Sequence, residues 1–212
     1  MSGQGSRGKG AGRANEPAHG EPAFTKGDFT ETPLQSESVF SGRLLHVKRD
    51  LVRLPDGNEA TREYIVHPGA VVILALTEAG DLVMERQFRY PLRREFFELP
   101  AGKIDPGEDT ADTARRELAE ETGFAAERWT RLSEFHPSIG YSTERIEIWL
   151  AEGLSEVGSK LDEEEFLEVF TLPLATAIDW VREGRITDTK SIAALFWADK
   201  VLLQKTWKAD PA

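Results

Sequence analysis

The sequence predicts an α+β fold, and three observations lead to it. Short strand-like runs fill residues 44–101, a helical pattern covers residues 109–122, and the chain ends in two helical segments, 174–183 and 188–203. Strands followed by a helix, further strands and a helical end are typical of sheets packed against helices around one core. A length of 212 residues with 40% hydrophobic content is enough for one sizeable domain.

A boundary is expected near residue 35. Residues 1–35 are rich in glycine, with scattered serine, proline and balanced charge. Such a segment buries too little apolar surface to offset the entropy of ordering it. We therefore expect a disordered glycine-rich tail over residues 1–35 and a folded domain over residues 36–206.

The first structured region is expected to be an antiparallel hairpin within residues 38–66. Residues 44–54 mostly alternate between apolar and polar, and residues 55–58 (Pro-Asp-Gly-Asn) form a hairpin-type turn. Residues 61–66 make the return strand.

The next strands carry the core. Residues 70–76 form a continuous apolar run, which predicts a strand buried on both faces. Residues 82–89 form another strand, and residues 96–101 lead into a glycine-bounded loop. Beyond the helix, residues 130–136 and 144–152 are expected to form two further strands.

Composition excludes several function classes. A formal net charge of -11 argues against a general nucleic-acid binder, which needs a basic surface. No apolar stretch approaches the roughly 20 residues of a membrane span, and no secretory signal is evident. The chain has no cysteine, so it is compatible with a reducing compartment, and a cytoplasmic location is expected.

The most informative segment runs from Gly102 to Phe124. Five residues separate Gly102 from Glu108, seven separate Glu108 from Arg116, and Glu-apolar-x-Glu-Glu-x-Gly-apolar follows. On a helix, positions i, i+3 and i+4 share one face, which groups the glutamates of the segment: Glu117, Glu120 and Glu121. Carboxylates grouped in this way attract hard divalent ions. A solvated acidic helix face is the alternative, but the glycines on both sides, with Gly123 placed as a left-handed C-cap, favour a built site.

This segment resembles the Nudix box, Gly-x5-Glu-x7-Arg-Glu-U-x-Glu-Glu-x-Gly-U with U bulky and apolar. Every specified position is met, with Leu118 and Phe124 in the two U positions. The resemblance implies the Nudix fold, a mixed β-sheet sandwiched between helices, over most of residues 38–205. It also implies a hydrolase of nucleoside diphosphates linked to another moiety, working with Mg²⁺ or Mn²⁺.

The same resemblance assigns roles within the box. The metal ligands would be the backbone carbonyl of Ala101 with Glu117, Glu120 and Glu121, where Glu120 acts directly or through water and is counted as catalytic. Gly102, Glu108, Arg116 and Gly123 would be structural, with Arg116 orienting the glutamates by charge-assisted bonds.

Residues outside the box resemble the ADP-ribose pyrophosphatase branch, in Arg62-Glu63, in residues 85–91 and in residues 98–102. That branch exchanges an N-terminal hairpin between two subunits, so the resemblance implies a homodimer in which Arg62 and Glu63 reach the partner's nucleotide. Arg89 would contact the diphosphate or ribose, because a guanidinium matches phosphate oxygens in a bidentate way. The alternatives are an exposed cross-strand pair for Arg62 and Glu63, and a surface charge for Arg89.

A second substrate-binding segment is implied at residues 138–144. Ser138, Gly140 and Glu144 keep the family's frame at the terminal ribose, with Glu144 bonding the hydroxyls. Ile139 stands where ADP-ribose enzymes often have a marker proline, which leaves the choice of nucleotide sugar open. Lys103, beside the box glycine, is also counted as substrate-binding.

The proton acceptor is expected in the acidic segment of residues 161–169. By resemblance, Glu163 is the base and Glu165 a metal ligand, although spacing alone does not separate Glu163, Glu164 and Glu165. The alternative is an ordinary solvated acidic loop, and His136, before a proline, is more typical of a structural histidine.

Together these features predict a Mg²⁺-dependent homodimeric hydrolase that splits ADP-ribose, or a closely related ADP-sugar, into AMP and a sugar phosphate. One alternative is a hydrolase of another nucleotide sugar, such as GDP-mannose. The other is a non-catalytic regulator that binds a nucleotide sugar, against which a complete set of box glutamates argues.

Overall fold

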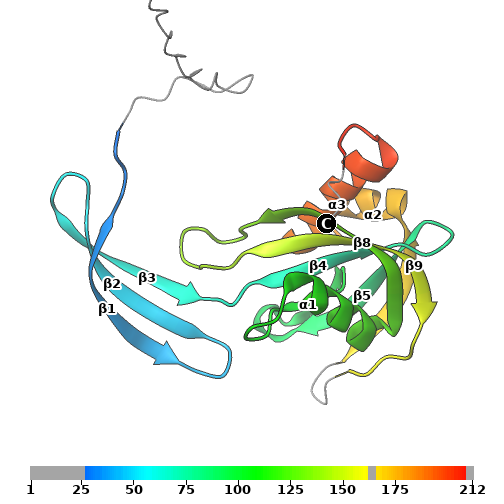
Figure 1. Cartoon of the computed structure of the whole chain (residues 1–212), viewed down its shortest axis with the longest axis horizontal. Coiled ribbons are helices and arrows are strands. Elements are labelled where there is room, and N and C mark those ends of the chain that lie inside the picture. The colour runs from blue at the N-terminus through cyan, green and yellow to red at the C-terminus, as the bar shows by residue number, and fades with distance from the viewer. Residues whose placement is uncertain (1–26, 162–165, 209–212) are drawn as a thin grey trace, which may run out of the picture.

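A computed structural model describes residues 27–161 and 166–208 of the chain. In this part, a three-stranded sheet stands away from a larger body that holds the other strands and all the helices (Figure 1). No helix in these residues is both long and apolar enough to cross a membrane.

The outer sheet is antiparallel, with the strand order β1-β2-β3. Its strands are β1 (Thr32–Ser41), β2 (His46–Arg53) and β3 (Glu59–Val66). The turn between β2 and β3 needs Gly57, whose φ of 88° is a left-handed conformation that side chains disfavour. All ten residues of β1 are exposed, so the sheet has little core of its own.

Two sheets form the body. One has the order β7-β4-β9-β8, where β4 (Ala70–Ala75) runs parallel to β9 (Ile146–Glu156) and antiparallel to β7 (Ala101–Lys103). The other has the antiparallel order β10-β5-β6. The remaining strands are β5 (Asp81–Arg89), β6 (Arg94–Glu98), β8 (Phe124–Phe135) and β10 (Leu167–Pro173).

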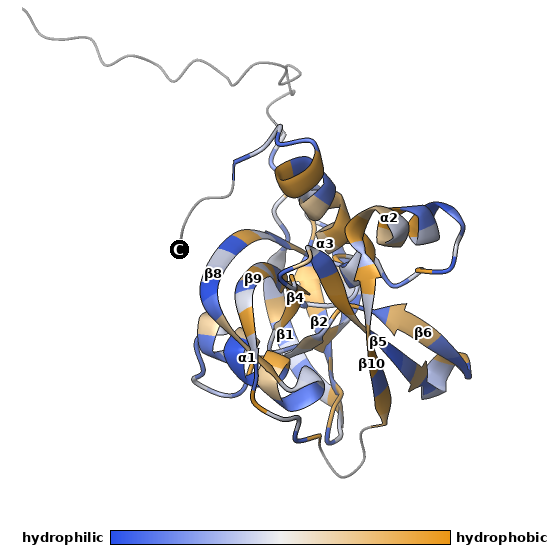
Figure 2. Cartoon of the chain, turned by 90° about the vertical axis from the view of Figure 1, so that its right-hand side faces the viewer, coloured by the Kyte–Doolittle hydropathy of each residue, from blue (hydrophilic) through white to orange (hydrophobic). Residues whose placement is uncertain are grey.

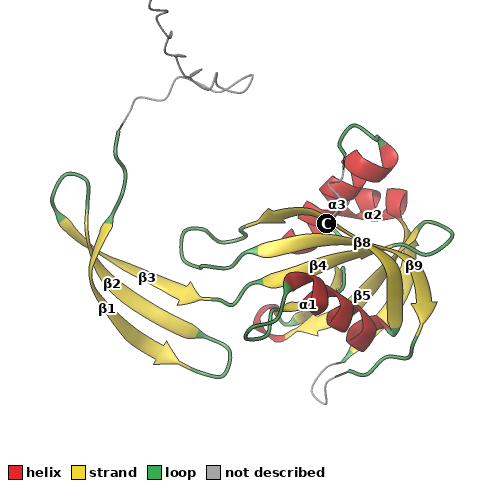
Figure 3. Ribbon diagram, viewed as in Figure 1, coloured by secondary structure: helices red, strands yellow, loops and turns green. Residues whose placement is uncertain are grey.

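Helices cover both sides of these sheets (Figure 3). On one side lies α1 (Thr110–Glu117), which continues into η2 (Leu118–Thr122), a π-turn. On the other lie α2 (Leu174–Arg182) and α3 (Thr189–Ala198), which ends in a second π-turn, η3 (Asp199–Leu203). A single turn of 3₁₀-helix, η1 (Tyr90–Leu92), joins β5 to β6.

Strand β4 separates two hydrophobic clusters. Val72 and Leu74 face one cluster, which includes residues of α2 and α3, whereas Val71 and Ile73 face the other, beneath α1. Figure 2 shows the apolar strands between α1 and the helices α2 and α3. All four side chains are fully buried, which confirms the expected strand buried on both faces and the α+β sandwich.

The structure departs from the sequence-based boundaries in three places. Strand β1 begins at Thr32, so residues 32–35 belong to the outer sheet and not to the expected tail, whose residues 1–26 lie outside the described part. Strand β8 begins directly after Gly123 and not at residue 130. Residues 167–169, expected in an acidic loop, begin strand β10, which pairs with β5.

The two-sided burial of β4 predicts a large loss of stability when it is trimmed. Ile73→Ala should lower the free energy of unfolding by about 2–5 kcal/mol, because the neighbours of a fully buried isoleucine cannot fill the space. Ile139→Ala is a matched control on an 84% exposed residue and should change it by less than about 0.5 kcal/mol. Urea unfolding followed by circular dichroism measures both, and equal losses would contradict this account of the core.

Candidate active site

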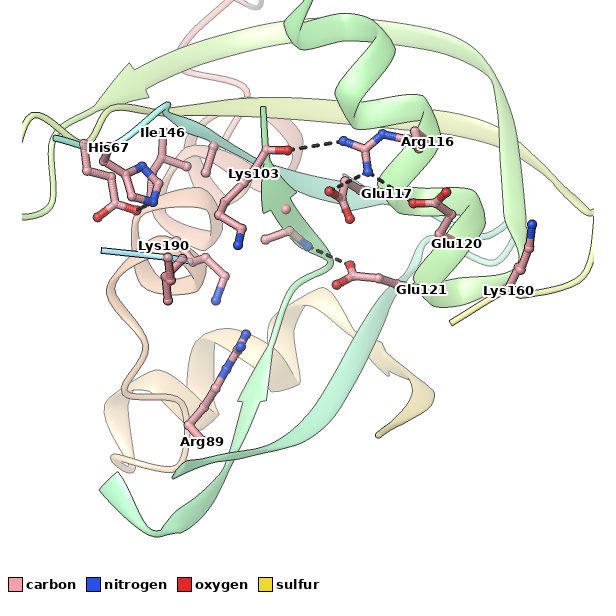
Figure 4. A pocket seen from close by; sticks show the side chains of 15 residues that line it. His67, Arg89, Lys103, Arg116, Glu117, Glu120, Glu121, Ile146, Lys160 and Lys190 are labelled. Carbon is pink, nitrogen blue, oxygen red and sulfur yellow. Dashed lines mark hydrogen bonds and ion pairs between the residues drawn. The ribbon is translucent and has the colours of Figure 1, made fainter. Parts of the chain in front are cut away.

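A cavity of about 460 Å³ opens between the end of α1, the short strand β7 and the N-terminus of α3. Its volume is within the usual range for small-molecule sites. Figure 4 shows the box glutamates on one side and His67 on the other, with Lys103 between them and Lys190 and Arg89 below. The residues expected from the sequence that line it are Arg89, Ala101, Gly102, Lys103, Arg116, Glu117, Glu120, Glu121 and Glu144.

The guanidinium of Arg116 holds the acidic side together. It donates two hydrogen bonds to the Glu108 carboxylate, at 3.0 and 2.8 Å, and reaches Glu117 at 2.9 Å and Glu120 at 3.1 Å. It also donates to the backbone carbonyl of Lys103 at 3.2 Å, which ties the helix to β7. Hydrogen bonds to Glu108, and then the charge of Glu117, raise the pKa of Arg116 despite its partial burial, so it stays cationic.

Glu108 supports the loop rather than facing the cavity. Its bonds from Arg116, followed by one from the Thr113 hydroxyl, lower the pKa of Glu108 to about 2. The carboxylate is therefore ionised throughout the neutral range, and with Arg116 it fixes the loop to the first turns of α1.

Gly102 leaves room for a carboxylate. A Cβ atom at this position would overlap the side-chain carboxyl of Glu117. Because glycine stands there, the Glu117 carboxylate lies directly against the backbone of β7, next to Ala101. The first box glycine is thus explained by close approach and not by an unusual backbone angle.

Glu121 lies on η2 and is 5% exposed. Its Oε2 accepts a hydrogen bond from the backbone N–H of Ala101 at 3.0 Å, so this carboxylate also meets the end of β7. The π-turn then ends at Gly123, whose φ of 75° confirms the expected left-handed cap.

The end of the box also anchors the segment that follows β9. The carbonyl of Gly123 accepts hydrogen bonds from the backbone N–H groups of Val157 and Gly158, and the carbonyl of Glu120 accepts one from Lys160. A Cβ atom on Gly123 would lie 2.8 Å from the backbone nitrogen of Ser159. This packing brings the chain to the glutamates just before residue 162. Glu163, Glu164 and Glu165 themselves lie outside the described residues.

The donor set suits a hard divalent ion in chemical type. Carboxylates from Glu117, Glu120 and Glu121 and the carbonyl of Ala101 are oxygen donors, which Mg²⁺ and Mn²⁺ prefer. Among the described residues, however, no three acidic or histidine side chains converge closely enough to hold an ion by themselves. Arg116 and the Ala101 N–H engage the glutamates in the arrangement seen here.

An ion-pair network around the buried carboxylate of Glu98 forms the cationic wall. The guanidinium of Arg89 makes two hydrogen bonds of 2.8 Å to Glu98, whose side chain is 4% exposed and is also paired with Lys190. Burial raises the pKa of Glu98, but the bonds from Arg89 and the charge of Lys190 outweigh it and lower the pKa to about 2. The sequence identified Arg89 but not Lys190.

Lys190 reaches the cavity because α3 is fastened to Leu99, which directly follows β6 and precedes the box. Asp188 caps α3 by accepting from the Ser191 N–H at 3.0 Å, and the Ser191 hydroxyl in turn accepts from the backbone N–H of Leu99 at 2.9 Å. This contact spans 92 positions in the chain, so no local pattern could reveal it. His67 and Lys160 are further cavity residues that sequence reasoning missed.

The expected substrate-binding residues on the outer sheet and in the turn at residues 138–140 lie outside this cavity in the single chain. Arg62 is on the outer sheet and is paired with Glu31 at 2.8 Å, and Glu63 accepts from Arg49 at 2.9 Å. Ser138, Ile139 and Gly140 form a turn at the surface, where the Ser138 hydroxyl contacts the Tyr141 hydroxyl at 3.3 Å. Their assigned roles stay predictions.

Comparison with known proteins agrees with this geometry. Residues 66–197 match the family model described as the NUDIX domain. Residues 31–65 match the model described as the nucleoside diphosphate sugar hydrolase N-terminal domain, which coincides with the outer sheet.

Similar proteins cover most of the chain. The ADP-ribose pyrophosphatase of Bacillus subtilis is 41% identical over 78% of this chain and 90% of its own length. The ADP-ribose pyrophosphatase of Mycobacterium tuberculosis is 38% identical over 76% of this chain and 80% of its own length. A methanol dehydrogenase activator of Bacillus methanolicus is 41% identical over 79% of this chain and 91% of its own length.

A solved structure titled "Crystal structure of ADP compounds hydrolase" superposes with a TM-score of 0.77 at 27% identity. The match covers 85% of this chain and 98% of that one. With the box complete, its glutamates gathered at one cavity and the domain model spanning that cavity, the chain belongs to the Nudix family.

Proposed function

We propose that this protein hydrolyses the diphosphate bond of ADP-ribose, or of a closely related ADP-sugar, to give AMP and a sugar phosphate. The observation that carries the proposal is the composition of the cavity, which brings carboxylates from the box and several cationic side chains to one space. A diphosphate needs both: cations to bind its charge, and carboxylates to hold a metal beside it. The similarity to ADP-ribose pyrophosphatases supports ADP-ribose as the substrate.

The cationic wall would bind the diphosphate. Arg89 presents a planar fork that Glu98 already holds in one orientation, so little freedom is lost when phosphate oxygens bind. Lys190 and Lys103 would add positive charge from α3 and β7.

The acidic side would hold Mg²⁺, or Mn²⁺, through Glu117, Glu120, Glu121 and the Ala101 carbonyl. Such an ion supplies charge neutralisation at the diphosphate and lowers the pKa of a bound water. The absence of a Cβ at Gly102 supports this assignment, because it lets the Glu117 carboxylate stand beside the Ala101 backbone. Arg116 would keep the glutamates grouped when the site is empty.

The proton acceptor would lie outside the box, in the acidic segment that follows β9. Glu163 as proton acceptor and Glu165 as a further ligand stay predictions from the resemblance. The hydrogen bond from Lys160 to the Glu120 carbonyl supports them, since it brings the preceding residues to the box.

We further propose a cytoplasmic homodimer in which the outer sheet of one protomer completes the cavity of the other. The exposed apolar side chains of this region, Leu34, Val39, Phe40, Leu44 and Leu45, support an interface there. Arg62 and Glu63 lie on the same sheet and outside their own cavity, which is consistent with a role toward a partner's nucleotide.

A substrate panel tests the proposed activity. With Mg²⁺, the protein should release AMP from ADP-ribose faster than it releases the nucleotide from GDP-mannose, NADH or a diadenosine compound, as measured by chromatography of the products. A preference for GDP-mannose would replace ADP-ribose with the other nucleotide sugar. Tight binding of ADP-ribose without turnover of any compound would identify a regulator instead.

Glu121 should be indispensable. Glu121→Gln removes a carboxylate charge from the metal site at nearly constant shape, so the turnover of ADP-ribose should fall at least about 100-fold while the melting temperature stays close to wild type. Glu127→Gln changes a 77% exposed glutamate on β8 and should leave the rate unchanged. A Glu121→Gln enzyme with near wild-type turnover would refute the metal assignment.

Subunit complementation tests the shared site. Arg62→Ala and Glu121→Gln should each be impaired, but co-refolding them in equal amounts should restore about a quarter of the wild-type sites, because half of the dimers hold one intact site. The rate of AMP release measures the recovery. A mixture no more active than the mean of the two variants, or a monomer in sedimentation, would rule out the exchange.

A further inference from the structure

Two polar side chains face each other on the wall across from the box glutamates. His67 precedes β4, and its Nε2 lies 3.8 Å from Oε1 of Glu144, just before β9. Both line the cavity, and their side chains are only 15% and 27% exposed. This separation is too long for a good hydrogen bond, so both atoms can bond to a third polar group that reaches them from the cavity.

The hydrogen bonds of His67 determine which nitrogen carries the proton. The backbone N–H of Gly69 donates to Nδ1 of His67 at 3.1 Å, so Nδ1 is an acceptor. A neutral imidazole then has its hydrogen on Nε2, the nitrogen that faces Glu144. The wall therefore presents a donor beside a carboxylate acceptor.

The fold holds this pair rigidly. The His67 N–H donates to the Thr143 hydroxyl at 2.9 Å, the Thr143 N–H donates to the Ile65 carbonyl at 3.0 Å, and the Ala70 N–H donates to the Arg145 carbonyl at 2.9 Å. Gly69 makes the turn possible, because its φ is 98° and a Cβ would press on Ile104 and Arg145. Residues 65–70 and 141–145 are thus closed together by hydrogen bonds.

A donor and an acceptor side by side match a hydroxyl group, which both donates and accepts. We propose that His67 is a specificity residue, whose Nε2–H donates to a sugar hydroxyl that in turn donates to Glu144. The recognised group is a hydroxyl of the moiety joined to the nucleoside diphosphate. This inference rests on the proposed function, which supplies the ligand. It adds a residue that distinguishes ligands with a hydroxylated second moiety from ligands without one.

Equilibrium binding tests the pair without relying on turnover. The full chain, with EDTA present, is titrated calorimetrically with ADP-ribose and with the methyl ester of ADP on its terminal phosphate, which has the same charge and no second sugar. Wild type should bind ADP-ribose about tenfold more tightly, and His67→Phe should abolish most of this difference while changing methyl-ADP affinity less than about twofold.

Two further variants separate recognition from a structural role. His67→Gln places an amide donor near the position of Nε2 and should restore part of the preference. His136→Phe makes the same change at an exposed histidine outside the cavity and should leave both affinities unaltered.

Equal affinity of wild type for the two ligands, or an equal loss of both in His67→Phe, would overturn the inference. Failure of the proposed function gives a different result. In that case wild type would release no AMP from ADP-ribose with Mg²⁺, whether or not the tenfold binding preference is present.

Discussion

The site depends on one constraint: several carboxylates must stay grouped on the end of one helix although their charges repel. A single guanidinium meets it, because Arg116 bonds to Glu108, Glu117 and Glu120 at once. Arg116 also donates to the Lys103 carbonyl, which fixes the position of α1 relative to β7. This bond, together with the one from the Ala101 N–H to Glu121, sets where the Ala101 carbonyl lies relative to the glutamates.

The opposite walls of the cavity come from other parts of the chain, and each is fastened separately. The N-terminus of α3 is held by the hydrogen bond from Leu99, directly after β6, to Ser191, which places Lys190 beside Glu98 and Arg89. The His67 side is closed against residues 141–145. Because these walls are anchored independently, residues that contact the substrate can change while the box glutamates keep their positions. One fold can thus serve different functions.

The buried strand and the acidic helix could be predicted from the sequence, because local residue patterns determine both. The apolar run of β4 and the spacing of the box glutamates gave a buried strand and a helix with a shared acidic face. The sequence patterns do not identify strand β1, because all its residues are exposed and it is defined by backbone pairing with β2. The start of β10 lies in an acidic run, and its pairing with β5 is a contact between segments far apart in the sequence. Lys190 and His67 owe their positions to contacts between distant segments, which single-sequence patterns do not encode.

The exposed edge of strand β1 is a potential site of aggregation. The strand lies at the edge of its sheet, where unpaired backbone groups could recruit any extended segment and start aggregation. Its sequence opposes this: the pairing with β2 is interrupted between Pro33 and Gln35 and again between Ser38 and Phe40, Pro33 lacks an N–H, and Glu37 adds a charge. These irregularities interrupt the edge and increase its twist, so the exposed strand is a poor template for pairing with other extended segments.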